Sequence, residues 1–309
     1  MKFVFQHNSA ERLDRFLARN IKGVSREFCK RLMERGYVSV NKEFTYDPSR
    51  RLQKGDIIEI SDFFKLPSCN IEPETGNLEV LFEDQHVIVV NKPAGILTHP
   101  LKGRTKGTLL NFILAHTKLA TTGLPLRPGV VHRLDRNTSG CIIFAKTDFA
   151  YFDLVNQFKD RIVKKVYRTV VEGIFPDGIE EISLPLRTSA SLAKVSVRFS
   201  GKNSTTKFKI LKKSKNATYL EVMPVTGRTH QIRVTLAFLG HPVLGDNKYG
   251  RQSPVIDRQA LHAFSISFLH PETKKQMCFS ARMPLDFLNL LKNLEITDVC
   301  NCPDNSSGL

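Results

Sequence analysis

The sequence predicts an α+β protein: a large domain with a mixed, mainly antiparallel sheet, preceded by a small α/β unit. Residues 77–294 hold many short segments of alternating or continuous apolar residues, separated by turn residues, which is the pattern of strands. A few segments between them have the spacing of amphipathic helices. Residues 1–61 form a separate basic stretch with two helix patterns and then two strand patterns. These observations predict two domains, with a boundary after residue 61.

The composition favours a polyanionic partner. The chain has 309 residues, enough for about two domains, and a formal net charge of +16. A field this basic favours nucleic acid. An anionic membrane surface is less favoured, because no segment combines a strongly basic face with an apolar one. Since the sequence also lacks an apolar run long enough for a membrane span and the apolar core of a signal peptide, we expect a cytoplasmic protein.

The sequence gives no reason to expect a cofactor or a metal ion. Its six cysteines are scattered, and Cys300 and Cys302 form a single C-x-C pair without a second pair nearby, so a zinc site is not expected. The basic loop 100–107 could hold a phosphate group. It lacks the G-x-x-x-x-G-K-[ST] pattern of a nucleotide-binding loop, and no nucleotide site is assigned.

The N-terminal unit, 1–61, is predicted to start with two helices. Asn8 has the position of an N-cap, with Glu11 reaching back, and Ser25 that of a cap for a second helix ending at Gly36. Strands are expected at Tyr37–Asn41 and Asp56–Ile60. The second helix has four cations on the side opposite its apolar residues: Arg26, Lys30, Arg31 and Arg35.

These four cations allow two interpretations. A solvated helix face is the ordinary explanation of such a charge cluster. Only Glu27 and Glu34 oppose the cations, however, so a surface that contacts nucleic-acid phosphates is the alternative.

A linker and a dense polar motif follow. Residues 62–76 carry prolines and acids with little periodicity and are predicted to be a linker. Strands are expected at 78–82, 87–90 and 96–97, and a helix at 109–114. The stretch Gly129–Gly140, GVVHRLDRNTSG, places Asp135 between Arg133 and Arg136 in a loop between two buried strand segments. An acid flanked by two cations should stay ionised. The alternative is a structural ion pair in a turn.

The remainder of the large domain is predicted to be rich in strands. A helix is expected at 149–158 and a strand at 164–171, with Tyr167, Thr169 and Val171 on one face. Further strands are expected at 182–186, 194–199, 205–211, 219–225, 261–269 and 277–281. The motif TGRTHQIR at 226–233 leads from a glycine turn to a helix ending at Gly240, with Thr229 as its cap and Arg233 in its first turns. Residues 295–309 are predicted to be a disordered tail.

Six stretches of the large domain, in order, resemble the motifs of the RluA-type pseudouridine synthases. They are NKPAG with HP at 91–100, HRLDRNTSG at 132–140, KKVYRTVVEG at 164–173, TGRTHQIRV at 226–234, GHPVLGD with YG at 240–250, and LHA with HP at 261–271. The resemblance covers about residues 77–285. The N-terminal unit resembles the S4 RNA-binding domain in its element order and in RGYVSVNK at 35–42. The chain is thus similar to the members of the family that act on the large ribosomal subunit.

The resemblance implies a function and roles for individual residues. The family isomerises uridine in RNA to pseudouridine, by breaking the glycosidic bond and rejoining the base through C5, without cofactor or metal. Asp135 matches its catalytic aspartate, Tyr167 the tyrosine beside the flipped base, Arg233 the basic partner of the aspartate, and Arg133 the arginine that fills the space of the flipped base. The S4-like unit would contact RNA backbone through its four cations. A monomer acting on large-subunit ribosomal RNA is expected.

Alternatives remain open at this stage. The chain could be a non-catalytic RNA-binding ribosome-assembly factor with the same fold, an enzyme directed to tRNA, or a hydrolase with Asp135 as nucleophile. A hydrolase would need a second carboxylate or a metal cluster, and the sequence shows neither near Asp135. His132 and His230 fit the motifs, and for them we expect structural hydrogen bonds. Thr235 departs from the histidine that the family often has there, which affects RNA contacts rather than chemistry.

Overall fold

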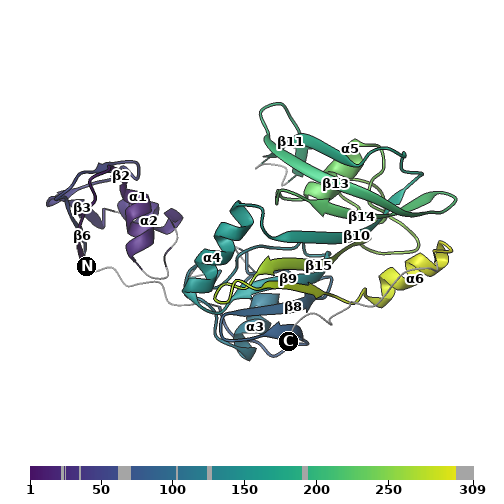
Figure 1. Cartoon of the computed structure of the whole chain (residues 1–309), viewed down its shortest axis with the longest axis horizontal. Coiled ribbons are helices and arrows are strands. Elements are labelled where there is room, and N and C mark those ends of the chain that lie inside the picture. Colours follow the sequence, from purple (N-terminus) through teal and green to yellow (C-terminus); the bar gives the residue numbers. More distant parts are fainter. Residues whose placement is uncertain are drawn as a thin grey trace.

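The computed structural model describes residues 1–21, 24, 26–34, 36–61, 71–101, 104–123, 127–189 and 194–296, with the side chains of Glu27 and Arg31 excepted. The α+β class and the mainly antiparallel sheet predicted from the sequence are confirmed. Figure 1 shows a small N-terminal unit beside a large domain built around a long sheet.

The N-terminal unit has a four-stranded sheet and two helices. The strand order is β1-β6-β3-β4, all antiparallel, with β1 at Lys2–Val4, β3 at Val38–Val40, β4 at Glu43–Phe44 and β6 at Ile57–Ile60. A further pair joins β2 (Glu11–Arg12) to β5 (Arg51–Leu52). Helices α1 (Leu13–Asn20) and α2 (Arg26–Glu34) contribute Phe16, Leu17 and Met33 to its core. The apolar residues of these helices and strands thus give the N-terminal unit a hydrophobic core of its own.

Helix α1 begins later than predicted, and Asn8 does not cap it. Its N-cap is Arg12, without a side-chain hydrogen bond. The first N–H groups of the helix are instead satisfied by tertiary contacts: Leu13 N–H donates to Arg50 O (2.8 Å) and Asp14 N–H to Pro48 O (3.2 Å). Because distant carbonyls take these donors, no local cap is needed. The predicted cap of α2, Ser25, lies outside the described residues.

The large domain is organised on one ten-stranded sheet. Nine strands follow the order β12-β11-β13-β14-β10-β15-β9-β8-β7, and β16 also pairs with β15. The bounds are β7 Glu79–Glu83, β8 Val87–Lys92, β9 Ser139–Ala145, β10 Lys164–Glu172, β11 Glu181–Ser189, β12 Lys194–Val197, β13 Lys202–Lys213, β14 Ala217–Pro224, β15 Leu261–Leu269 and β16 Gln276–Ser280. The pairing of β9 with β15 is parallel, and the other pairs of described strands are antiparallel.

The continuous apolar runs of the sequence are strands buried on both faces. Along β8, Ile88 and Val90 pack into one cluster with α3 (Leu109–His116). Val87 and Val89 pack into another with Ala150 and Leu154 of α4 (Asp148–Lys159). Two helices on opposite faces leave no solvated side on this strand, which explains why its residues do not alternate in polarity.

A second core joins the sheet to α5 (Gln231–Phe238) and α6 (Leu285–Asn293). The sequence analysis missed α6, whose Phe287, Leu290 and Leu291 are buried in this core. None of the described helices is long and apolar enough to span a bilayer.

The segments flanking the large domain extend it beyond the predicted bounds. Of the predicted linker, 62–70 lies outside the described residues, whereas Ile71 is buried and Glu74 N–H donates to Asn111 O of α3 (3.1 Å). At the other end Ile296 is buried, and residues 297–309 lie outside the described part. The predicted strand at Ile96–Leu97 is a single bridge between Leu97 and Thr108. The domain bounds of the sequence analysis otherwise stay a prediction.

Candidate active site

Asp135 lies in a loop whose carbonyl groups are held by hydrogen bonds. Four successive carbonyl groups, from Leu134 to Asn137, accept a hydrogen bond. The donors are Thr98 Oγ1 for Leu134 (2.9 Å), Thr138 N–H for Asp135 (3.1 Å), Gly95 N–H and Lys92 Nζ for Arg136 (both 3.0 Å) and Arg258 Nη1 for Asn137 (3.1 Å). A loop satisfied in this way fixes the position of its side chains before any substrate binds.

The loop rejoins the sheet at Gly140, where only glycine fits. Gly140 has a φ of +115°, and a Cβ placed there would lie 2.1 Å from Ala263 O of β15. This close approach occurs where β9 and β15 pair in parallel. The loop is thereby attached to the centre of the sheet.

Lys92 is a buried residue that contacts the loop through a hydrogen bond. Its side chain is fully buried, and its Nζ donates to Pro93 O (2.8 Å) as well as to Arg136 O. Burial, with a contribution from Arg258, lowers the pKa of Lys92 to about 7, although Asp135 opposes this shift.

The prediction that the side chain of Asp135 lies between those of Arg133 and Arg136 is wrong. Arg136 is exposed and its Nε donates to Gly95 O (2.8 Å). Arg133 is also exposed and lines the cavity described below. Neighbouring side chains diverge along this loop, so the cation that contacts Asp135 comes from elsewhere in the chain.

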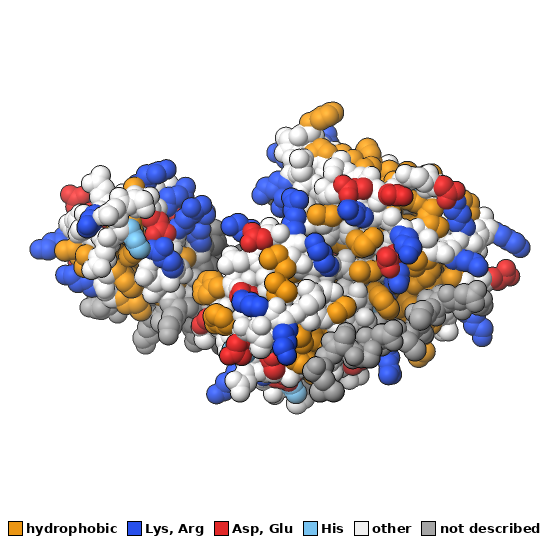
Figure 2. Space-filling model, viewed as in Figure 1, with side chains coloured by type: hydrophobic (Ala, Val, Ile, Leu, Met, Phe, Trp, Pro, Cys, Tyr) orange, Lys and Arg blue, Asp and Glu red, His pale blue; other side chains and the backbone are white. Residues whose placement is uncertain are grey.

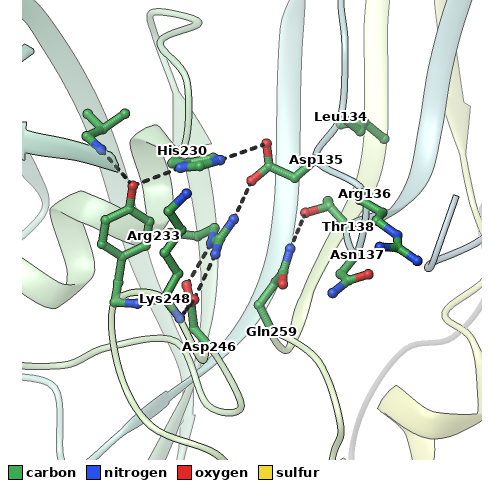
Figure 3. Close-up of polar contacts among 12 residues, drawn as sticks. Leu134, Asp135, Arg136, Asn137, Thr138, His230, Arg233, Asp246, Lys248 and Gln259 are labelled. Atoms are coloured by element: carbon green, nitrogen blue, oxygen red, sulfur yellow. Dashed lines mark hydrogen bonds and ion pairs between the residues drawn. The ribbon is translucent and has the colours of Figure 1, made fainter. Parts of the chain in front are cut away.

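That cation is Arg233, on α5. Its Nη1 donates to Asp135 Oδ2 (2.8 Å), while its Nε and Nη2 form a two-point contact with Asp246 Oδ2 (2.6 Å) and Oδ1 (2.8 Å). Figure 3 shows the guanidinium group between the two carboxylates. Burial of Arg233 by itself would lower its pKa, but the hydrogen bonds and charges of Asp246 and Asp135 prevail and raise it. Arg233 is therefore a permanent cation that orients Asp135.

The start of α5 differs from the prediction. His230, not Thr229, is the N-cap, in a left-handed conformation with φ 52° and ψ 22°, and α5 ends at Phe238. The preceding turn is closed by Gln231, whose Oε1 accepts from Thr226 Oγ1 (2.8 Å) and from Arg228 N–H (3.0 Å). Gln231 therefore stabilises the turn that precedes α5.

Tyr167 lies on β10. It pairs with Val222 of β14 and Ala263 of β15, next to a bulge between Val166 and Tyr167. Burial raises the pKa of its phenol, and Asp135 raises it further. Tyr167 is therefore neutral and able to donate a hydrogen bond.

Asp135, Tyr167, Arg133 and Arg233 line one cavity of about 370 Å³. Six of its described lining residues are cations and one, Asp135, is a carboxylate. The cations are Arg133, Lys159, Arg161, Lys165, Arg228 and Arg233. A cavity of this size and charge suits a polyanion that presents a small neutral group to one acid.

Two further residues of the cavity wall are held by hydrogen bonds. Lys165 Nζ donates to Thr226 O (3.3 Å), and burial lowers its pKa to about 8. His132 Nε2 accepts from Ile143 N–H (3.0 Å), its ring stacks on Phe158, and burial lowers its pKa to about 3. A neutral His132 with this bond fits the structural role expected for it.

The predicted phosphate contacts of the N-terminal unit are altered by one ion pair. Arg26 Nε donates to Asp14 Oδ2 (2.7 Å), so Arg26 is the partner of a buried carboxylate rather than a free cation. Lys30 is half-buried. The side chain of Arg31 and all of Arg35 lie outside the described part of the chain.

Another basic surface of this unit was not predicted from the sequence. A depression beside α1 is lined by four arginines and His7, together with Ser9, Ala10 and one acid, Glu11, which pairs with Arg19; the arginines are Arg12, Arg15, Arg19 and Arg51. Figure 2 shows several Lys and Arg side chains gathered on the N-terminal unit.

The comparisons with known proteins establish the family. The model of the RNA pseudouridylate synthase family matches residues 86–238, and that of the S4 domain matches residues 11–58. The ribosomal large subunit pseudouridine synthase D of Zymomonas mobilis subsp. mobilis is 40% identical over 302 residues, covering 93% of this chain and 95% of its own. An RNA pseudouridine synthase of Aquifex aeolicus is 37% identical, with coverage of 92% and 94%.

Solved structures agree on the fold. Human RNA pseudouridylate synthase domain containing 1 superposes with a TM-score of 0.54 at 24% identity, covering 74% of this chain and 98% of its own. The chain belongs to the RNA pseudouridylate synthase family, with an S4 domain at its N-terminus. It is an RNA pseudouridine synthase, so the non-catalytic alternative is excluded and RNA is its substrate.

The sequence analysis assigned no role to two residues of the site. Asp246 orients Arg233, and Tyr249 contacts both His230 and Arg233. The dipeptides Gly245-Asp246 and Tyr249-Gly250 were part of the matched motifs, so the signal was present. Their partners are more than ten residues away, which spacing alone does not reveal. Within the described residues, no group of three or more His, Cys, Asp or Glu side chains could hold a metal ion.

Proposed function

We propose that this enzyme isomerises uridines of large-subunit ribosomal RNA, and that Asp135 carries the chemistry. The observation that supports the role of Asp135 most directly is its place as the one carboxylate among the described residues that line a cavity with six cations, hydrogen-bonded to Arg233 at 2.8 Å. The RNA class is supported by relatives along nearly the whole chain that are named ribosomal large subunit pseudouridine synthase D.

The chemistry follows from access and charge. A stacked uridine exposes neither C1′ nor C5, so the base must leave the stack and enter the cavity. The N1–C1′ bond breaks, the base turns, C5 bonds to C1′, C5 loses a proton and N1 gains one. Asp135 acts either as nucleophile on C1′ or as base on a ribose proton, and both roles need an ionised carboxylate. Arg233 places its guanidinium group 2.8 Å from Asp135 Oδ2 and orients the carboxylate.

Two other residues act on the base and on the gap that it leaves. Tyr167 offers an aromatic face for stacking and a neutral hydroxyl group for hydrogen bonding or proton transfer. Arg133 is exposed at the cavity and can occupy the space in the RNA that the base vacates. The N-terminal unit adds phosphate contacts, which supply affinity without base recognition.

The remaining alternatives are distinguished by the site and by the RNA. A hydrolase using Asp135 would need a second carboxylate at the reacting bond, and the described lining of the cavity contains only this one. An enzyme acting on tRNA would have the same active site. Only a measurement of which RNA is modified distinguishes it from our proposal. The monomeric state and the cytoplasmic location expected from the sequence stay predictions.

The test combines one variant with two RNA classes. Asp135→Asn should abolish isomerisation while RNA binding survives, because the amide retains the shape but not the charge. Asp177→Asn is the matched control, since Asp177 is an exposed carboxylate paired with Lys213, outside the cavity. Pseudouridine formation is measured on large-subunit ribosomal RNA and on tRNA, and pseudouridines are mapped in cells with and without the gene. Normal turnover by Asp135→Asn would refute the role of Asp135. If the pseudouridines that depend on the gene lie in tRNA alone, the proposal that the substrate is large-subunit ribosomal RNA is wrong.

A further inference from the structure

A second contact reaches Asp135 on the oxygen that Arg233 does not bind. His230 Nε2 lies 3.8 Å from Asp135 Oδ1, and His230 Nδ1 lies 2.8 Å from the hydroxyl group of Tyr249. That hydroxyl group also accepts a hydrogen bond from Val195 N–H on the edge strand β12 (3.0 Å). A chain of polar contacts thus runs from a strand edge to the acid (Figure 3).

The partners of Tyr249 determine which nitrogen of His230 carries the proton. The Tyr249 oxygen already accepts from Val195, and burial raises the pKa of the phenol, so it keeps its hydrogen. Among the described residues, His230 Nδ1 is the acceptor within hydrogen-bonding distance of that hydroxyl group. A nitrogen that accepts cannot carry a proton, so in the neutral imidazole the hydrogen is on Nε2 and faces Asp135.

Burial is the main cause that favours the neutral form of the His230 ring. Burial lowers its pKa, Arg233 and Lys248 act in the same direction, and Asp135 and Asp246 oppose them. A neutral ring contributes a hydrogen-bond donor to the acid without adding a second cation.

We infer that His230 and Tyr249 are positioning residues, which hold Asp135 Oδ1 through a donor on His230 Nε2 whose tautomer Tyr249 sets. The inference rests on the proposed role of Asp135. When His230 Nε2 reaches hydrogen-bonding distance of Oδ1, with Arg233 on Oδ2, the carboxylate is held at both oxygens and cannot rotate about its last bond. The distance of 3.8 Å is longer than a hydrogen bond and is expected to shorten when the substrate fills the cavity.

Two features of the fold support this arrangement. His230 has a left-handed backbone, which is uncommon for residues other than glycine, and it forms the cap of the helix that carries Arg233. Both contacts to Asp135 therefore come from the first turn of α5. The ring of Tyr249 also lies under the Arg233 guanidinium group, 5.2 Å from its Cζ atom, so one side chain supports both contacts.

The experiment removes the hydroxyl group and keeps the ring. Tyr249→Phe should lower the single-turnover rate about ten-fold, the cost of misplacing one charge-assisted hydrogen bond, and leave RNA affinity unchanged. His230→Asn should have a similar effect, because asparagine tolerates the left-handed cap but cannot span from Tyr249 to Asp135. The double variant should be no slower than the slower single variant, since the two residues act through one chain.

The protonated nitrogen can be observed directly. Nitrogen NMR of the whole protein labelled at histidine should show His230 with Nε2 protonated and Nδ1 not, and Tyr249→Phe should remove this preference. Tyr219→Phe is the matched control, because Tyr219 is a buried tyrosine of β14 whose hydroxyl group contacts Met283 outside the cavity. It should change neither the rate nor the His230 signal.

The outcomes separate this inference from the proposed function. A proton on Nδ1 in the unaltered protein, normal single-turnover rates in both single variants, or additive losses in the double variant would overturn the inference. If Asp135→Asn is inactive in the same assays, the role of Asp135 stands whichever of these results is found. If Asp135→Asn turns over normally, the proposed function fails first and the inference fails with it.

Discussion

Replacing Arg233 by methionine should destabilise the large domain and abolish activity together. Asp246 has 1% of its side chain exposed, and Arg233 has 8%. Without the guanidinium group, Asp246 loses its cationic partner, while the N–H groups of Lys248 (3.0 Å) and Tyr249 (3.3 Å) still donate to its Oδ1. Leaving one member of a buried ion pair without its partner costs about 3–5 kcal/mol in unfolding free energy. Most of this loss comes from the unpaired Asp246 carboxylate.

The pH dependence of the unfolding free energy shows whether the unpaired Asp246 carboxylate causes the loss of stability. Despite its burial, the pKa of Asp246 is lowered by the hydrogen bond and charge of Arg233, so its ion pair stabilises the fold above the ordinary pKa of an aspartate and is lost as the pH falls. In Arg233→Met, burial without a cation raises this pKa above the ordinary value. The carboxyl group of the variant then takes up a proton as the pH falls, which relieves its cost. The gap in stability between the two proteins should therefore be largest near neutral pH and shrink on acidification.

The assay is urea unfolding followed by circular dichroism, at pH 7.5 and at a series of lower pH values down to the ordinary pKa of an aspartate, about 3.9. The double variant Arg233→Met with Asp246→Asn is the control, because it removes the unpaired charge and should be more stable than Arg233→Met alone. A loss below about 1 kcal/mol, which is typical of an exposed ion pair, would refute the reasoning, as would a gap that does not change with pH.

Two further predictions concern the loop support and the N-terminal unit. Burial lowers the pKa of Lys92 to about 7, so the unfolded chain binds more protons between about pH 7 and 10.4, and stability should rise with pH in that window. Lys92→Met should lack this rise; urea unfolding at pH 7 and 9 measures it, and parallel changes in both proteins would contradict it. Replacing Arg31 and Arg35 by glutamate should weaken RNA binding and flatten its dependence on salt concentration. An unchanged slope in a salt titration would mean that these two positions contact no phosphate.

Several features of the fold and the site could be read from local sequence. The apolar runs at 87–90 and 141–145 predicted buried strands, because strands covered on both faces lack polar alternation. The polar loop between Val131 and Cys141 predicted a site, and the motif order identified Asp135, Tyr167 and Arg233 as its members. All three line one cavity in the structure.

Helix α6 was missed although Pro284 and Asp286 have residue types that are favoured at a helix start. Thr229 has the residue type of a cap, but α5 begins after His230. The start of α1 was mispredicted because tertiary contacts replace a local cap: the helix begins after Arg12, and carbonyls of the segment 48–50 accept from its first N–H groups. Such competition between local and distant hydrogen-bond partners is outside the reach of spacing rules.

The sequence by itself predicted the family, most of the strands and, through the family motifs, Asp135 as the acid and Arg233 as its basic partner, because motif residues and periodicity are local properties of the chain. Spacing alone favoured the cations next to Asp135, and the tertiary structure decided which cation contacts Asp135. Its neighbours Arg133 and Arg136 do not, whereas Arg233 does, from 98 residues further along the chain. The sheet order, with β15 between β9 and β10, joins distant segments of the chain into one cavity wall. An ion pair depends on such distances in space, and these are set by the packing of the whole domain.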